Sequence, residues 1–257
     1  MSEPVALVTG ASAGLGATFA RRLAARRYNL ILVARREDRL AELARGLPID
    51  TRTLAADLAT DSGVDLVCQA IRDEPSLELL VNNAGFGTLG RFWQTDMRRQ
   101  EDMYALHVLA VMRLTRAALE GMTTRAKGAV INVSSIAAFS QSEGNVSYCS
   151  TKAWMNSFTE GLDIELRSAG SPVQVQALCP GFTITEFHDV LGIDRKEIPS
   201  FLWLPAEKVV DASLEALATR KVIVVPGWQY KITAQVVKRL PWFIRRRAQR
   251  PGKDRRV

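Results

Sequence analysis

The chain has 257 residues, of which 47% are hydrophobic and 24% charged, the balance of a globular protein with a sizeable core. Its last twenty residues hold nine Lys or Arg against the single acid Asp254, so with a net charge of +7 for the whole chain the other 237 residues carry −1. The body is close to neutral, and its composition does not indicate a nucleic-acid-binding protein.

The cysteines and the N-terminus predict a reduced, cytoplasmic setting. Cys68, Cys149 and Cys179 fit no close-spaced metal pattern, and their odd number argues against a disulfide framework. The run MSEPVALVTG enters a strand-like segment without the basic region and long apolar stretch of a secretory signal, and no apolar run is long enough to span a bilayer. We expect no metal site.

Strand-like and helix-like segments alternate along the chain. Apolar and β-branched runs predict strands at residues 5–9, 30–34, 51–56, 77–82, 129–135 and 173–180. Helical periodicity follows each of them, at residues 19–27, from Glu37, and at 65–72, 96–122, around 148–152 and 205–217. Such alternation predicts a doubly wound, three-layer Rossmann-like α/β fold with a central parallel sheet. Since no linker divides the chain, we expect one catalytic domain over residues 1–237 and a basic tail over 238–257.

A glycine-rich turn separates the first strand from the first helix. The segment TGASAGLG contains Gly10, Gly14 and Gly16. Glycines in this position let a pyrophosphate approach the backbone amides at a helix N-terminus. The spacing is Gly-x3-Gly-x-Gly rather than the more familiar GxGxxG, and a tight turn that binds nothing is the alternative.

The end of the second strand indicates which dinucleotide would bind. An acid there would accept hydrogen bonds from a ribose diol and repel a 2′-phosphate, but the segment VARRED has Ala34 in that place. Arg35 and Arg36 follow, and guanidinium groups suit phosphate. We therefore predict NADP(H) as the cofactor. The alternative is that both arginines are merely solvated.

The pentapeptide YCSTK places Tyr148 and Lys152 four residues apart, on one face of a helix. A phenol titrates near ~10, but a unit charge ~4 Å away at an effective dielectric of ~20 contributes ~4 kcal/mol, or about 3 pK units. Lys152 would thus bring the pKa of Tyr148 near neutrality, as general acid/base catalysis requires. A surface or core role is the alternative for an isolated Tyr-x3-Lys pair.

Support for a catalytic pair comes from Ser134 and Ser135, at the end of the strand that precedes YCSTK. Parallel strands end at the cofactor crevice, where a serine hydroxyl can stabilise charge on a carbonyl oxygen. A turn or helix cap is the alternative for this Ser-Ser pair.

In this order, TGASAGLG, Asp57-Leu58, NNAG at Asn82 to Gly85, Ser135, YCSTK and CPGFTIT resemble the short-chain dehydrogenase/reductase family, over residues 5 to about 186. The resemblance implies that Tyr148 is the acid/base, that Lys152 lowers its pKa and holds the nicotinamide ribose, and that Ser135 orients the substrate. It also implies homodimers or homotetramers built on the long helices. The implied cofactor-binding residues, besides Tyr148 and Lys152, are Gly10, Ser12, Gly14, Leu15, Gly16, Asp57, Leu58, Asn83, Ala84, Gly85, Pro180, Gly181, Thr183 and Thr185.

One position departs from the family pattern. Where the long central helix usually has an asparagine that helps hold a proton-relaying water, this chain has His107, in ALHVLAVMRLTRAALEGM. An imidazole can donate and accept a proton near neutrality, so His107 is a candidate relay. The alternative is a packed helix residue with no catalytic role.

A long apolar-rich connection at residues 182–204 is a candidate lid over the substrate. We assign no catalytic role to its polar members Glu186 and His188. Its aromatic and aliphatic residues, with three from the loop after NNAG, favour an apolar substrate, although several of them would fit core or oligomer contacts equally well. They are Phe182, Phe187, Val190, Leu191, Ile198, Phe201, Leu202, Trp203, Phe86, Phe92 and Trp93.

The basic tail mixes Trp242, Phe243 and Ile244 with clustered arginines. Apolar residues flanked by cations can bind an anionic membrane surface, and a solvated tail or an oligomer contact is the alternative.

Together these features predict an NADP(H)-dependent oxidoreductase that reduces a ketone or aldehyde to an alcohol, or the reverse, with a small, apolar substrate. A dinucleotide-binding regulator or scaffold that has lost turnover is the alternative, and His107 is its sequence support.

Overall fold

The computed structural model describes residues 3–187 and 198–239, and seven strands within these ranges form one parallel sheet. The order across the sheet is β3-β2-β1-β4-β5-β6-β7, which confirms the predicted doubly wound α/β fold. The strands are β1 (Val5–Thr9), β2 (Asn29–Ala34), β3 (Thr51–Ala55), β4 (Leu77–Asn82), β5 (Ala129–Val133), β6 (Gln174–Leu178) and β7 (Ile223–Val224).

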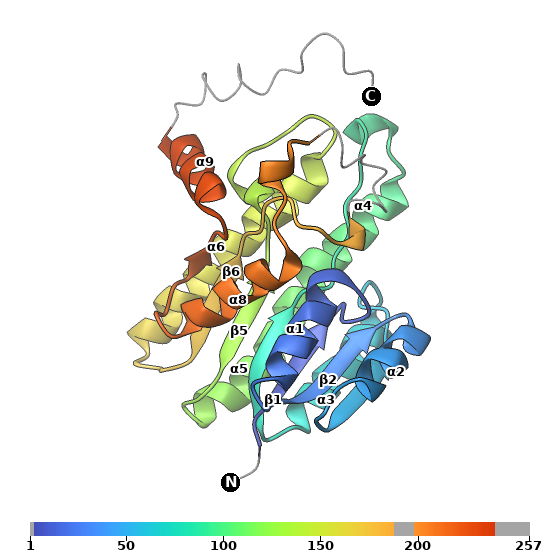
Figure 1. Ribbon diagram of the computed structural model, residues 1–257, viewed down its shortest axis with the longest axis vertical. Helices are drawn as coiled ribbons and strands as arrows, with labels where there is room; N and C mark the ends of the chain where they lie inside the picture. The colour runs from blue at the N-terminus through green and yellow to red at the C-terminus, as the bar shows by residue number, and fades with distance from the viewer. Residues whose placement is uncertain (1–2, 188–197, 240–257) are drawn as a thin grey trace.

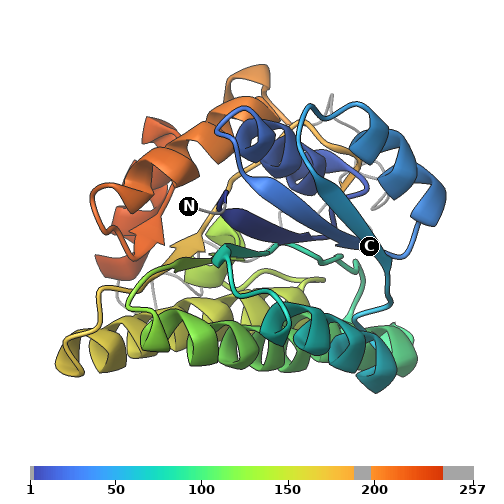
Figure 2. The ribbon, with the colours of Figure 1, turned by 90° about the horizontal axis from the view of Figure 1, so that it is seen from below.

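The central strands form because their residues are apolar on both faces. Every residue of β1 is buried: Ala6 and Val8 point into one hydrophobic core, whereas Val5 and Leu7 point into the other. A sheet with two buried faces needs a helical layer on each side, and Figure 2 shows the two layers above and below it.

One layer consists of α1 (Gly14–Ala24), α2 (Glu37–Arg45) and α8 (Ala206–Leu217). The opposite layer consists of α3 (Asp61–Arg72), α5 (Val111–Thr124) and α6 (Val146–Ser168). The pairs α1–α8 and α3–α5 pack side by side within their layers.

The helix predicted over residues 96–122 is interrupted. It consists of α4 (Met97–Tyr104), a π-helical turn η2 (Ala105–Ala110) and α5. A π-turn is a local irregularity that is frequent at functional sites, and this one contains His107.

The remaining elements gather near the carboxyl ends of the strands, where Figure 1 shows α4 and α9 at the upper end of the molecule. They are η1 (Phe92–Gln94), η3 (Ile136–Phe139), η5 (Ser200–Leu202) and α9 (Trp228–Arg239). None of the helices in the described ranges is both long and apolar enough to cross a membrane. The thiols of Cys68, Cys149 and Cys179 are buried, and none of the three forms a disulfide.

Candidate active site

The candidate site lies at the carboxyl edge of the sheet, where β1 is flanked by β2 on one side and β4 on the other. Chain connections leave these strands toward opposite faces, and such a switch point opens a crevice for a ligand. Predicted residues from the ends of β1, β4, β5 and β6 all meet along this edge.

The glycine turn after β1 has room for nothing larger than glycine at two positions. Gly10 has φ +64°, and a Cβ there would lie 2.9 Å from the Ala84 Cα. A Cβ on Gly16 would lie 2.2 Å from the Gly10 carbonyl oxygen. The helix α1 then begins at Gly14 without a side-chain cap from Ala13, so its first N–H groups face the turn. A bare backbone cradle at a helix N-terminus fits the pyrophosphate of a dinucleotide.

Thr9 and Asn83 fasten this turn to the end of β4. The Asn83 Nδ2 donates to the carbonyl oxygens of Thr9 at 2.8 Å and Gly10 at 3.3 Å. In return the Thr9 hydroxyl oxygen accepts hydrogen bonds from the backbone N–H groups of Asn83 and Ala84, at 2.9 and 3.0 Å. Sequence reasoning missed Thr9, whose only signal is a polar residue at the end of an apolar strand.

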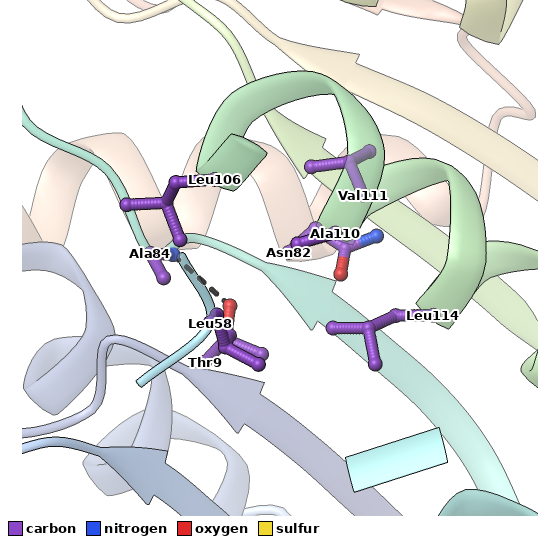
Figure 3. Close-up of a pocket in the computed structure, with 8 residues that line it drawn as sticks. All are labelled: Thr9, Leu58, Asn82, Ala84, Leu106, Ala110, Val111 and Leu114. Carbon is purple, nitrogen blue, oxygen red and sulfur yellow. Dashed lines mark hydrogen bonds between the residues drawn. The ribbon is translucent and has the colours of Figure 1, made fainter. Parts of the chain in front are cut away.

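Next to the hydrogen bonds between Thr9 and the end of β4 lies a narrow crevice that is too small for a water molecule. Figure 3 shows Thr9, Leu58, Asn82 and Ala84 facing residues of η2 and α5 across it. The predicted cofactor residues Leu58 and Ala84 are therefore supported directly by the helix that contains the π-turn.

The two arginines after β2 lie beside the glycine turn and the residue Asp57. Arg36 donates to the Ser12 hydroxyl from Nε at 3.2 Å and from Nη2 at 3.1 Å, which joins α2 to the glycine turn. Arg35 Nη1 lies 3.9 Å from Oδ2 of Asp57, and Asp57 accepts a hydrogen bond from the Ala59 N–H. Exposed guanidinium groups beside the turn are chemically suited to a phosphate.

Ser135, Tyr148 and Lys152 are brought together at the ends of β5 and α6. The Ser135 side chain is hydrogen-bonded to that of Tyr148 and also caps η3 by accepting the Ala137 N–H at 3.1 Å. Ser134 points elsewhere, donating to the Lys152 carbonyl oxygen at 3.0 Å. Ser135 is thus both the cap that the alternative interpretation expected and a partner of the phenol.

Tyr148 and Lys152 share one helix face, and Lys152 Nζ lies 5.7 Å from the centre of the Tyr148 ring. Burial raises the pKa of Tyr148 to about 12, with the Ser135 hydrogen bond acting in the opposite direction. Burial also lowers the pKa of Lys152 to about 7. The prediction that Lys152 brings the Tyr148 pKa near neutrality is therefore wrong for the protein by itself, because desolvation of the buried phenol is the largest influence on its pKa.

His107 is completely buried within η2, and both of its ring nitrogens have protein partners. Nε2 accepts the backbone N–H of Phe86 at 3.2 Å, which leaves the ring proton on Nδ1, 3.0 Å from the Thr151 hydroxyl. Thr151 in turn donates to the Tyr148 carbonyl oxygen. Burial holds the pKa of His107 well below its ordinary 6.5. His107 thus connects the loop after β4 to α6, and its relay role stays a prediction.

The close approach of Gly85 makes the same connection tight, since a Cβ there would lie 2.7 Å from His107 Nε2. A glycine at this predicted cofactor position is therefore required by the imidazole behind it.

The segment after β6 folds back across the site. Pro180 accepts a hydrogen bond from the Ile136 N–H, and Thr183 and Ile184 pair with Leu204. Gly181 packs against the ring of Tyr230, whose hydroxyl accepts the Phe182 N–H at 3.0 Å and donates to the Leu202 carbonyl oxygen. Tyr230, on α9, is a second residue that sequence reasoning missed.

Thr185 lies over the glycine turn, because a Cβ on Gly14 would be 3.2 Å from the Thr185 Cβ. Leu15, the next residue of the turn, packs against the hydrophobic core.

The candidate lid at residues 182–204 is described only at its two ends. Phe187 lies 6.0 Å, centroid to centroid, from Tyr148, and Phe182 lies 5.5 Å from Trp203. Phe86 faces His107 at 6.1 Å, whereas Trp93 and Phe201 are largely exposed. His188, Val190 and Leu191 fall outside the described residues, as do Trp242, Phe243 and Ile244 of the tail.

Comparison with known proteins gives one family. A family model described as short chain dehydrogenase matches residues 4–196. A 3-oxoacyl-(acyl-carrier-protein) reductase of Vibrio cholerae is 30% identical over 208 residues, covering 80% of this chain and 84% of that protein.

Solved structures agree with this family. A short-chain dehydrogenase from Sphingobium yanoikuyae in complex with NADPH is 29% identical with a TM-score of 0.83, covering 99% of this chain and 98% of that one. A bulky-bulky ketone specific alcohol dehydrogenase from Comamonas testosteroni is 27% identical with a TM-score of 0.78, covering 94% and 96%. A family member from Burkholderia phymatum in complex with NAD, 23% identical with a TM-score of 0.82 and covering 100% and 98%, shows the fold alone.

Proposed function

The chain belongs to the short-chain dehydrogenase/reductase family, and on that premise we propose that it is an NADP(H)-dependent oxidoreductase that reduces an apolar ketone or aldehyde to the alcohol, or catalyses the reverse. Membership makes it an oxidoreductase that uses a nicotinamide cofactor. The choice of NADP(H), the substrate class and the role of Tyr148 are the further steps that we propose.

The glycine cradle and the arginines support the choice of cofactor. Gly10 and Gly16 leave backbone exposed at the start of α1, where a pyrophosphate would bind. Arg35 and Arg36 would hold the 2′-phosphate, since no acid stands at the end of β2. Lys152 would hold the nicotinamide ribose. The bound cofactor would supply or accept the hydride.

Tyr148 would transfer the proton of the reaction. Its phenol would donate a proton to the substrate oxygen during reduction and accept one during oxidation. Ser135, already hydrogen-bonded to this phenol, would donate to the same substrate oxygen and stabilise its developing negative charge. Lys152 in its ammonium form would favour the phenolate and so would oppose the rise in the pKa of Tyr148 that burial imposes.

The surroundings of Tyr148 support an apolar substrate. Phe187 approaches its ring from the candidate lid, and Phe86 lies 6.1 Å from His107, which itself lies 6.0 Å from Tyr148. The Comamonas relative acts on bulky-bulky ketones, as its description states. We therefore propose a hydrophobic ketone as the first substrate to test.

We also propose a homodimer or homotetramer built on the long helices. Tyr104, Leu109 and Met112 expose apolar surface along α4, η2 and α5, with exposed fractions of 43%, 53% and 42%. Burial of such residues against a second copy would remove apolar surface from water. The cytoplasmic location stays a prediction.

A further partner that we propose is an anionic membrane surface. Trp228, Ile232 and Val236 lie on one exposed side of α9 beside the exposed Phe201, and we call these four residues the α9 face. The nine Lys or Arg of residues 238–257 follow directly in the chain. Apolar side chains next to a strongly cationic segment have the complementary chemistry for anionic lipid headgroups.

The hydrogen bond between Ser135 and Tyr148, with Lys152 Nζ 5.7 Å from the centre of the Tyr148 ring, is the observation that carries the proposed reaction. We would monitor NADPH absorbance with a panel of hydrophobic ketones, aldehydes and alcohols. Tyr148→Phe should lower the rate at least about 100-fold, the usual contribution of a general acid. Tyr28→Phe removes the same hydroxyl from a half-buried tyrosine just before β2, at the opposite edge of the sheet from the site, and should leave the rate unchanged. Equal rates for wild type and Tyr148→Phe would refute the mechanism.

A further inference from the structure

Glu186 connects the segment after β6 to the first turn of α2. Its Oε1 accepts a hydrogen bond from Arg39 Nη1 at 2.7 Å, and its Oε2 lies 3.4 Å from both Nη1 and Nη2 of Arg36. The same Arg36 guanidinium holds the Ser12 hydroxyl of the glycine turn. The Glu186 carboxylate therefore occupies an anion site formed by Arg36 and Arg39, next to the Ser12 hydroxyl.

The location of the Glu186 carboxylate is important because no acidic residue stands at the end of β2. An acid at the end of the second strand favours a ribose diol and repels a 2′-phosphate, and Ala34 removes that acid from the sequence. Glu186 restores a carboxylate beside Arg36 from 150 residues away. The hydrogen bond from Arg39 lowers the pKa of Glu186, so the group stays ionised at neutral pH.

The ion pairs are also accessible to a ligand. The side chains of Arg36 and Arg39 are each 43% exposed, and that of Glu186 is 50% exposed. Exposed ion pairs are individually weak, so a phosphate dianion can displace the carboxylate. The two guanidinium groups exceed the charge of Glu186 by one, which still attracts an anion.

We propose that Glu186 is a determinant of cofactor selectivity, which competes with the 2′-phosphate of NADP(H) for Arg36 and Arg39. A cofactor with a free 2′-hydroxyl leaves the carboxylate in place, whereas a 2′-phosphate must displace it. Glu186 thus narrows the preference for NADPH over NADH that the arginines alone would give. The inference rests on the proposed NADP(H) activity.

The test is direct binding to the purified full-length protein, measured by fluorescence or calorimetric titration with NADPH, NADH, 2′-AMP and 5′-AMP. Glu186→Gln removes the competing charge and keeps the size of the side chain. Glu37→Gln is the matched control, because Glu37 has the same charge as Glu186 and is exposed in the first turn of α2, the helix that contains Arg39. Thermal unfolding of all three proteins checks that they are equally folded.

We expect Glu186→Gln to bind NADPH and 2′-AMP about fivefold more tightly, with the affinities for NADH and 5′-AMP changed by less than about twofold. If Glu186→Gln and Glu37→Gln changed the affinities for NADPH and 2′-AMP equally, the inference would be overturned, because the loss of any nearby negative charge would explain the result. Absence of 2′-AMP binding in all three proteins would also overturn it, since Arg36 and Arg39 would then hold no phosphate.

Failure of the proposed function gives a different result. A protein that turns over none of the carbonyl panel, but in which Glu186→Gln still tightens 2′-AMP selectively, refutes the proposed reaction and supports the inference. A wild type that binds NADPH and NADH equally counts against the proposed NADP(H) preference. A selective gain in 2′-AMP affinity in Glu186→Gln would then support Glu186 as the cause of that equal binding.

Discussion

The ε-amino group of Lys152 donates a hydrogen bond to the backbone carbonyl oxygen of Val133, 2.8 Å away at the last residue of β5. Lys152 is only 5% exposed, and no carboxylate in the described part of the chain forms a salt bridge with it. A buried ammonium held by a neutral carbonyl keeps its charge at a cost, which is why the pKa of Lys152 falls to about 7.

The first prediction concerns stability between pH 7 and pH 9.5. In the unfolded chain Lys152 has a pKa near ~10.4, so in this window the unfolded state binds more protons at this residue than the native state does. The lysine therefore makes the free energy of unfolding rise with pH, by roughly 3 kcal/mol across the window. Above pH 10 the raised pKa of Tyr148 reverses the trend, because the unfolded tyrosine loses its proton first.

Urea unfolding of wild type and Lys152→Met at several pH values measures this contribution. For Lys152→Met, the free energy of unfolding should not rise between pH 7 and pH 9.5. This variant should be more stable than wild type at pH 7, although it would lose activity. The same slope in both proteins would mean that Lys152 is not desolvated.

Much of the fold could be predicted because its signals are local. Strands such as β1 and β4 are apolar on both faces, and they recur with helices between them, so parallel pairing and two cores follow from pattern alone. The π-turn around His107 could not be predicted, since it depends on which backbone hydrogen bonds form within an otherwise regular helix. The two-residue strand β7 and the helix α9 are too weakly patterned to stand out.

Within the candidate site, the sequence identified chemical types better than their environments. Tyr148 and Lys152 share a face because i and i+4 positions do so in any helix. Their pKa values depend on burial, which the sequence does not contain, and the argument from charge alone had the wrong sign for Tyr148. The contact of Glu186 with Arg39 joins residues 147 apart and follows only from the path of the segment after β6.

The second prediction concerns His107 at acidic pH. The pKa of His107 is well below 6.5 in the native state. As the pH falls through 6.5, the unfolded chain therefore binds a proton at His107 that the native protein does not bind. Native stability should therefore decrease from pH 7 to pH 5, by about 1.4 kcal/mol for each pH unit below 6.5.

His107→Leu should remove this pH dependence and also cost about 2 to 4 kcal/mol at pH 7, since it leaves the Phe86 N–H without its acceptor and removes the hydrogen bond between the imidazole and the Thr151 hydroxyl. His188→Gln replaces the other histidine and should keep the wild-type dependence. If thermal denaturation gives the same acid sensitivity in wild type and His107→Leu, the imidazole is not buried in its neutral form.

The third prediction compares two glycines. Gly16→Ala would place a Cβ 2.2 Å from a backbone carbonyl oxygen, so the turn must shift. We expect a loss of about 2 kcal/mol in stability and at least about a tenfold loss of NADPH affinity by titration. Gly161→Ala is the control: it lies in α6 with no atom within 4 Å of its new Cβ and should gain about 0.5 to 1 kcal/mol. Normal NADPH binding by Gly16→Ala would remove the glycine turn from the proposed cofactor site.

The last prediction concerns the α9 face. Trp228, Ile232 and Val236 are 72%, 55% and 50% exposed at intervals of four residues, while Tyr230 and Ala234 on the opposite side hold α9 against the body. Lys231 is exposed on the same helix, and the cations of residues 238–257 follow it. Because apolar insertion and anionic attraction act together, binding should require both acidic lipid and these side chains.

Co-sedimentation with vesicles separates the two contributions. Wild type should bind phosphatidylglycerol-containing vesicles and not vesicles of phosphatidylcholine alone, and high salt should weaken the binding. Trp228→Glu with Ile232→Glu should reduce binding at least about tenfold, because charged groups resist leaving water. Leu66→Glu is the control, since Leu66 is 47% exposed on α3 and lies apart from the α9 face. Equal binding by the full chain and by a chain ending at residue 237 would exclude the cationic tail from the contact.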